Sequence, residues 1–225
     1  MIRILLVICF GFSIFQQASS QSMQKKTLTY LALGDSYTIG ESLPQKDNFP
    51  NQAVQLLSEA GFFIEPPTII AKTGWTSEEL QWGIGNRSIQ PRYDIVSLLI
   101  GVNNQYRNGE LSVYSKQFEE LLQQAIQFAG DMPAHVFVLS IPDWGMTPFA
   151  EGKDRESIAK EINSFNFINK SISRKWKVNY IDITAGSREA GHDHTLVTSD
   201  GLHPSAREYK RWAEKLAAGI QQQFH

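Results

Sequence analysis

Short apolar runs alternate with longer segments of helical character through most of the chain. The clearest run, residues 93–100, is apolar at every position from 95 to 100 except Ser97, as expected of a strand covered on both faces. Strands that alternate with helices usually pair in parallel, and the helices cover both faces of the sheet. The chain is therefore predicted to adopt an α/β fold. The expected arrangement is a flavodoxin-like three-layer α/β/α sandwich with a five-stranded parallel sheet. The other four strands are predicted at 28–33, 68–71, 135–141 and 178–183.

Helix signals fill the intervals between these strands. Residues 50–60 carry apolar side chains at helical spacing, and Gly61 follows them as a common residue just past a helix end. Acidic residues directly after Ser77 predict a helix that starts there. Further helices are predicted at 111–128, 154–176 and 204–224.

The composition suits one globular domain with a sizeable core. Of the 225 residues, 42% are hydrophobic and 20% are charged. The formal net charge is −2, from 21 basic and 23 acidic residues. A charge so close to neutral produces no strong positive field, so no nucleic acid partner is expected.

The first twenty residues have the pattern of an export signal. Arg3 supplies a positive charge, residues 4–15 are apolar, and residues 18–20 have the small side chains expected before a cleavage site. We therefore expect residues 1–20 to be a signal peptide and residues 21–225 to be a single domain, secreted or periplasmic, with no stable membrane anchor. The alternative is an uncleaved anchor, although this apolar run is short for a membrane-spanning helix.

The only cysteine, Cys9, lies within this expected signal peptide. A mature chain without cysteine forms no disulfide and has neither a thiol nucleophile nor a thiolate metal ligand. Nucleophilic chemistry in the mature chain would therefore depend on a different side chain.

A serine follows the first predicted strand almost directly. The apolar run at 28–33 ends at Gly34, and Asp35 and Ser36 come next. In open α/β sheets, ligands bind at the carboxyl ends of strands, where the free N–H groups of a following helix also point. A hydroxyl there can attack a substrate beside a backbone donor for the developing oxyanion. The same three residues also suit an ordinary turn, so the motif alone leaves both interpretations open.

Asp200 and His203 offer the other two members of a Ser-His-Asp system. Serine is a poor nucleophile unless a base takes its proton, and His203 is the candidate base because it lies in a polar turn near a carboxylate. His135 opens a predicted strand and His225 is the last residue, which favours other roles for both. The alternative for Asp200 and His203 is a helix-capping turn.

Four separated blocks resemble the SGNH branch of the GDSL-type serine hydrolases. They occur in the order of that family and span nearly all of the chain after residue 27. The Gly-x-Ser-x-Gly nucleophile elbow of the larger α/β-hydrolase fold is absent around Ser36. The four blocks are Gly34-Asp35-Ser36, Gly74, Gly101-Val102-Asn103 and Asp200-x-x-His203.

The resemblance implies a role for each matching residue. Ser36 would be the nucleophile, His203 the base and Asp200 the carboxylate that orients the base. The oxyanion hole would consist of the backbone N–H groups of Ser36 and Gly74 and the side-chain amide of Asn103. No cofactor is implied. The chain departs from the family pattern at residue 104, where asparagine stands in place of the common aspartate.

Residues beside these blocks are candidates for the substrate pocket, because side chains near strand ends form natural pocket walls. Ordinary packing is the alternative for each aromatic residue among them. The candidates are Asp35, Tyr37, Trp75, Asn104 and Trp144.

His192-Asp193-His194 invites interpretation as a metal site, since histidine and aspartate are good ligands. No third histidine at helical spacing accompanies them. A polar loop at the rim of the site is therefore the preferred interpretation, and no metal is expected.

These features together predict an exported serine esterase that cleaves carboxylic esters through an acyl-enzyme on Ser36. The expected substrate is an acylated sugar, a short-chain ester or a lysolipid. The alternatives within the family are a lysophospholipase and a thioesterase. A non-catalytic ligand-binding module on the same fold is the alternative from outside the enzymes.

Overall fold

A five-stranded parallel sheet organises residues 26–224, the part of the chain that this computed structural model describes. The strands lie in the order β2-β1-β3-β4-β5, and every neighbouring pair is parallel. The predicted signal peptide lies outside the described residues. The strands are β1 (Tyr30–Asp35), β2 (Thr68–Lys72), β3 (Ile95–Leu99), β4 (Val136–Leu139) and β5 (Asn179–Ile181).

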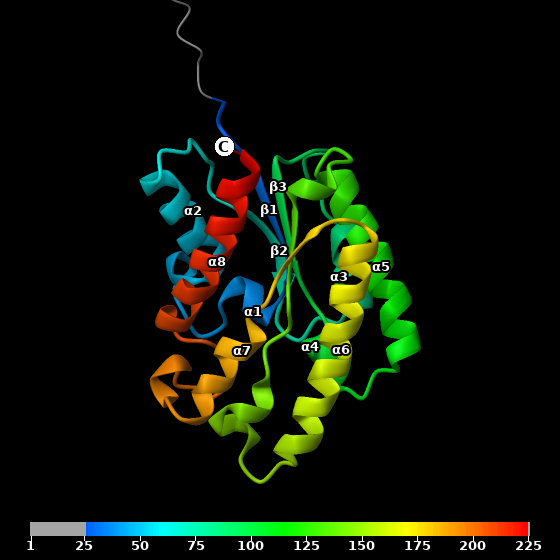
Figure 1. Cartoon of the computed structure of the whole chain (residues 1–225), viewed down its shortest axis with the longest axis vertical. Helices are drawn as coiled ribbons and strands as arrows, with labels where there is room; N and C mark the ends of the chain where they lie inside the picture. Colours follow the sequence, from blue (N-terminus) through cyan, green and yellow to red (C-terminus); the bar gives the residue numbers. More distant parts are fainter. Residues whose placement is uncertain (1–25, 225) are drawn as a thin grey trace, which may run out of the picture.

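Helices cover both faces of this sheet (Figure 1). On one face α2 (Phe49–Glu59) packs against α8 (Ala206–Phe224). On the other face lie α3 (Ser77–Gly85), α5 (Leu111–Phe128) and α6 (Arg155–Lys175). The predicted three-layer α/β/α sandwich is therefore confirmed, because apolar runs buried on both sides need a helical layer over each face.

The helices begin where side chains can satisfy their first N–H groups. Asn48 caps α2 by accepting from the backbone N–H of Asn51 at 3.0 Å. At the start of α3, Thr76 and Glu79 form a reciprocal capping box. The last helix starts two residues later than its predicted opening at Pro204, because Pro204 forms an isolated antiparallel bridge with Val197.

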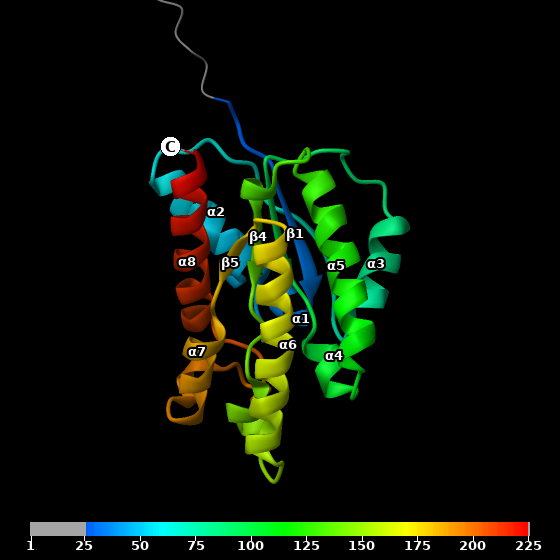
Figure 2. The ribbon, with the colours of Figure 1, turned by 45° about the vertical axis from the view of Figure 1, so that its right-hand side comes forward.

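The carboxyl ends of the strands all point to the same end of the molecule (Figure 2). Two short helices follow strands there: α1 (Ser36–Ile39) after β1 and α4 (Val102–Tyr106) after β3. A third, α7 (Thr184–Ser187), follows β5. The backbone of the sheet thus delivers residues from distant parts of the chain to one edge. Within residues 26–224, no helix combines the length and apolar character needed to cross a bilayer.

Candidate active site

A cavity of about 170 Å³ lies at this edge of the sheet. Ser36, Gly74, Asn103 and His203, to which the family resemblance gave roles in one site, all line it. The wall is otherwise mostly apolar and is drawn from loops and short helices across the chain. Its remaining lining residues are Tyr37, Thr73, Val102, Tyr106, Trp144, Phe149 and Leu202.

Ser36 is the first residue of α1 and directly follows the buried strand β1. The Asp35 side chain caps this short helix by accepting from the backbone N–H of Tyr37 at 3.0 Å. Gly34 is needed for close packing of the sheet, because a Cβ at this position would lie 2.5 Å from the carbonyl oxygen of Leu99. The Gly-Asp-Ser motif thus brings a hydroxyl to the strand end and leaves the first N–H groups of α1 without helical partners.

His203 is oriented by Asp200. Its Nδ1 lies 2.8 Å from Oδ2 of Asp200, and its ring packs against Tyr37 with centroids 5.1 Å apart. Because Nδ1 is engaged by the carboxylate, Nε2 is the ring nitrogen left for a substrate or a nucleophile. This is the arrangement in which a carboxylate fixes the tautomer of a base.

Asp200 is itself held by several donors. Its Oδ1 accepts from the backbone N–H groups of Leu202 and His203 at 2.8 and 2.9 Å, and the Ser42 hydroxyl donates to Oδ2 at 2.7 Å. Partial burial alone would raise the pKa of Asp200. The hydrogen bonds outweigh that effect and hold the pKa well below its usual range, so this carboxylate stays ionised next to the imidazole.

Ser36 and His203 share the cavity, although they are 167 positions apart in the sequence. Within residues 26–224, no hydrogen bond joins the Ser36 hydroxyl to the His203 ring. Catalytic hydrogen bonds of this kind are commonly long before substrate is in place and tighten in the reacting complex. The missing hydrogen bond is therefore compatible with a catalytic pair of Ser36 and His203.

The expected oxyanion donors surround the same space. Gly74 has a φ of 80°, a conformation that favours glycine, in the loop after β2. The Asn103 amide donates to the carbonyl oxygen of Trp75 at 3.0 Å and to Oδ2 of Asp35 at 3.3 Å. The longer of these two bonds is the one that an oxyanion on a substrate could displace at lower cost.

Asp35 is fully buried and does not line the cavity, in contrast to its expected place in the pocket wall. Burial raises the pKa of Asp35 to about 7, against the lowering effect of hydrogen bonds from Tyr37 and Asn103. Its role in the structure is support, since it caps α1 and contacts the Asn103 amide from behind the cavity.

Trp75 and Asn104 were also expected in the pocket wall, and neither lines the cavity. The indole of Trp75 packs so closely over Gly83 that a Cβ there would lie 2.2 Å from it. Asn104 accepts from the backbone N–H of Ser77 and donates to the Ser77 hydroxyl, both at 2.9 Å. These contacts fix the start of α3 relative to α4.

Asparagine at position 104 suits this hydrogen-bond network. Because the Asn104 amide donates to the Ser77 hydroxyl, the single hydroxyl hydrogen is free to reach Oε1 of Gln117 at 2.6 Å. A carboxylate at 104 would compete with Gln117 for that one hydrogen. The residues around position 104 thus offer the hydrogen-bond partners that an asparagine, rather than an aspartate, requires.

Tyr37 and Trp144 do line the cavity, as predicted, and two further aromatic residues join them. Tyr106 and Trp144 lie 5.2 Å apart between ring centroids, and Phe149 lies 6.0 Å from Trp144. Sequence reasoning missed Tyr106 and Phe149, although Tyr106 follows Asn103 by three residues, which is one helical turn. This wall of Tyr106, Trp144 and Phe149 is hereafter the aromatic wall.

The His192-Asp193-His194 segment has other partners in the structure. The Asp193 carboxylate accepts from the backbone N–H of Thr195 at 3.0 Å and forms an ion pair with Arg207 at 3.1 Å. Across residues 26–224, no three potential metal ligands among histidine, cysteine, aspartate and glutamate come together in a group that could hold an ion.

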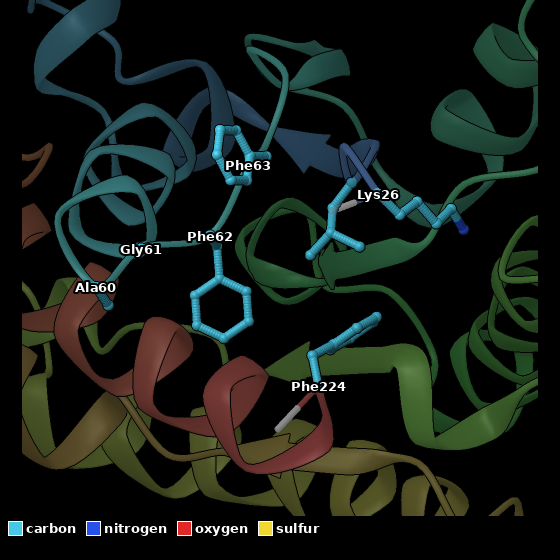
Figure 3. A pocket seen from close by; sticks show the side chains of 7 residues that line it. Lys26, Ala60, Gly61, Phe62, Phe63 and Phe224 are labelled. Atoms are coloured by element: carbon cyan, nitrogen blue, oxygen red, sulfur yellow. The ribbon is translucent and has the colours of Figure 1, made fainter. Parts of the chain in front are cut away.

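A second cavity of about 350 Å³ lies where the start of the described chain meets the end of α8 (Figure 3). Although larger, this cavity contains none of the predicted site residues and no histidine, serine or carboxylate side chain. The predicted site residues thus belong to the smaller cavity. The larger one is lined by Lys26, Leu28, Ala60, Gly61, Phe62, Phe63 and Phe224.

A serine at a strand end, an imidazole held by a carboxylate and amide donors around one cavity have the composition of a serine hydrolase site. The profile of the GDSL-like lipase/acylhydrolase family matches residues 32–211. The chain therefore belongs to this family of hydrolases. Among curated proteins, no sequence match is found.

Solved structures of similar fold include three of high coverage. TesA superposes with a TM-score of 0.69 at 17% identity, covering 87% of this chain and 99% of the other. The psychrotrophic esterase EstA from Pseudoalteromonas sp. gives 0.66 at 17% identity, over 86% and 97% of the two chains. Axe2, an acetyl xylan esterase from Geobacillus stearothermophilus, gives 0.64 at 17% identity, over 87% and 95%. At these identities, the likeness establishes the fold.

Proposed function

We propose that this hydrolase is an exported serine esterase that cleaves carboxylic esters through an acyl-enzyme on Ser36. The observation that carries the proposal is the shared cavity of Ser36 and His203, with His203 oriented by Asp200 at 2.8 Å. Export rests on residues 1–20, which have the pattern of a signal peptide.

The reaction would proceed in two balanced halves. Oγ of Ser36 attacks the ester carbonyl while Nε2 of His203 takes the hydroxyl proton, and Asp200 stabilises the imidazolium. The imidazolium then gives its proton to the leaving alcohol as the C–O bond breaks. Water then attacks the acyl-enzyme while His203 takes its proton, and the return of that proton to Oγ releases the acid and free Ser36.

Negative charge develops on the carbonyl oxygen in both halves. The proposed donors are the backbone N–H groups of Ser36 and Gly74 and the side-chain amide of Asn103. Donors held in place before the reaction stabilise this charge without reorganising, and one such donor contributes about 3 kcal/mol.

The size and lining of the cavity favour a small acyl group. Drug-sized ligands occupy pockets of roughly 300–1,000 Å³, whereas this cavity measures about 170 Å³ and much of its lining is aromatic. A short-chain or acetyl ester fits such a space. A lysophospholipid, or the thioester of a long-chain acid, carries a longer acyl chain, which would extend past the exposed rings of Tyr106 and Phe149.

Labelling with a fluorophosphonate tests the proposal against the non-catalytic alternative. The reagent is expected to form one adduct on Ser36, because only an activated serine reacts readily with it. A phosphonate, monoethylphosphonate, inhibits the similarly folded EstA. The intact mass of the labelled, exported chain would report the adduct and the loss of residues 1–20 together. A folded chain that stays unlabelled would favour a binding module.

Replacing Phe149 with alanine tests the aromatic wall. Phe149 is 42% exposed and lies at the rim, so its loss is expected to open space for longer acyl chains at little cost to folding. The ratio of kcat/KM for p-nitrophenyl octanoate to that for the acetate is expected to rise about 5- to 10-fold, within the range that pocket fit to a methylene can give.

Phe167→Ala is the matched control, because Phe167 is exposed on α6 and does not line the cavity. An unchanged ratio in Phe149→Ala, or the same rise in Phe167→Ala, would contradict acyl binding at the aromatic wall.

A further inference from the structure

We propose that Arg107 is a positioning residue that holds the Gly74 N–H and the Asn103 amide in the orientations that oxyanion donors need. The inference rests on the proposed function and goes beyond it, because Arg107 itself does not line the cavity. It follows from how α4 and its C-terminal cap residue, Arg107, hold the loop that follows β2.

Arg107 joins this loop to the start of α3. Its Nη2 donates to the carbonyl oxygen of Gly74 at 2.6 Å, and its Nη1 donates to Oε2 of Glu79 at 3.1 Å. The planar guanidinium is suited to holding two acceptors at once in a fixed geometry. One side chain thus fixes both the turn at Gly74 and the helix that follows it.

Gly74 needs such a restraint because glycine is conformationally permissive. Its φ of 80° is only one of many backbone conformations open to a residue without a Cβ. The peptide group after Gly74 is held on both sides, since its oxygen accepts from Arg107 and its N–H, from Trp75, donates to Lys72 at 3.2 Å. Fixing this peptide limits how far the preceding N–H of Gly74 can rotate away from the cavity.

The same helical turn carries the other donor. Asn103 and Arg107 are four residues apart, so they lie on one face of the turn, and the N–H of Arg107 donates to the Asn103 carbonyl at 3.1 Å. The Asn103 amide holds the carbonyl of Trp75 at 3.0 Å. The side chains of Asn103 in α4 and of Arg107, which caps the end of α4, therefore bind two consecutive carbonyls of the loop, and the Asn103 side chain is also a proposed oxyanion donor.

Glu79 aims the guanidinium. Its Oε2 also accepts from the backbone N–H and the hydroxyl of Thr76, at 2.8 and 3.0 Å. These bonds belong to the capping box of α3, so the carboxylate is tied to a rigid element. The ion pair is about half exposed, with side-chain exposures of 51% for Arg107 and 44% for Glu79. Exposed pairs of this kind contribute little to stability, so removing Arg107 should leave the fold intact.

Arg107→Met removes the donors and keeps an apolar stem of similar reach. We expect kcat for p-nitrophenyl acetate to fall about 10- to 100-fold, less than the roughly 10²- to 10³-fold loss on removing a whole donor. KM should stay within about twofold, because a transition-state interaction is lost rather than uniform binding. The affinity for a trifluoromethyl ketone, whose adduct places an oxyanion in the hole, should weaken by the same factor as kcat/KM. Arg107→Lys should recover part of the loss, since a lysine can bond Gly74 but does not reproduce the fork.

Arg87→Met is the matched control. Arg87 is also exposed and donates to a backbone carbonyl of β2, that of Ile69 at 3.4 Å, but it does not line the cavity. Its kcat should be unchanged, and thermal melts should place all three variants within a few degrees of the unaltered chain.

Several outcomes would overturn the inference. They are an unchanged kcat in Arg107→Met, a change in KM alone, a loss of kcat that parallels a loss of thermal stability, and an equal loss in Arg87→Met. The proposed function fails separately. If the unaltered chain shows no turnover that depends on Ser36, the esterase proposal falls and the inference with it. If that turnover is present and Arg107→Met matches it, the inference alone falls.

Discussion

Ser36→Ala is expected to lower kcat for p-nitrophenyl acetate by about 10⁶-fold, the scale seen when the nucleophile of a serine hydrolase triad is removed. The hydroxyl supplies the bond that forms the acyl-enzyme, and the other aliphatic hydroxyl on the cavity wall, that of Thr73, is engaged by the Glu41 carboxylate. A residual rate above that in water is expected from the proposed oxyanion donors, which the substitution leaves in place.

The fold should tolerate this change. Ser36 is buried at the start of α1, and alanine preserves the backbone N–H that is proposed as an oxyanion donor. Circular dichroism and the denaturant midpoint should therefore match those of the unaltered chain. Ser164→Ala, on the exposed side of α6, serves as the control and should retain full activity. Turnover that survives in folded Ser36→Ala would refute the assignment of the nucleophile.

Asp200→Asn is expected to lower kcat by about 10⁴-fold while leaving the geometry nearly unchanged. Oδ2 of Asp200 faces Nδ1 of His203 at 2.8 Å, so the carboxylate requires the tautomer with hydrogen on Nδ1. An amide NH₂ facing this nitrogen selects the opposite tautomer. Nε2 then carries the hydrogen and cannot accept the proton of Ser36.

The pH dependence of stability gives a second measurement on the same variant. The pKa of Asp200 is held well below its usual range, so its ionised form stabilises the folded chain at any pH above about 4, the ordinary value for aspartate. This contribution is lost as pH falls further toward the folded-state pKa. Urea unfolding between pH 2 and 6 should show a weaker loss on acidification for Asp200→Asn than for the unaltered chain.

Ser42→Ala is the control for this position. It removes the 2.7 Å hydrogen bond to Oδ2 but keeps the carboxylate beside His203, so kcat should fall by less than about tenfold, the effect of one lost hydrogen bond. If Asp200→Asn retained kcat within that same tenfold, orientation of His203 by this carboxylate would not be part of the mechanism.

The fold was predictable because the signals for strands and helices are local. The buried strand β3 is legible in residues 93–100 as an almost unbroken apolar run, and its burial on both faces is what such a run requires. The exact boundaries of the strands and helices were harder to predict. The expected opening of the last helix at Pro204 failed because Pro204 pairs with Val197, a contact that depends on the folded loop.

The candidate pocket likewise contains residues that the sequence could predict and residues that it could not. Tyr37 and Trp144 were chosen as neighbours of the motif blocks, and both line the cavity. Trp75 is adjacent to Gly74 in the same way, yet its indole turns away and packs over Gly83. Adjacency in sequence cannot distinguish these cases, because the direction of a loop side chain depends on what fills the space on either side.

The sequence by itself determined the α/β architecture and which residue types were available for chemistry, because periodicity and motif spacing are properties of the local chain. Only the tertiary structure decided that Tyr106 and Phe149 complete the aromatic wall, that Asp35 and Asn104 hold Asn103 and Ser77 without lining the cavity, and that Arg107 holds Gly74. The physical reason is that these contacts join segments tens of residues apart, and their geometry is set by how strands and helices pack rather than by any neighbouring residue.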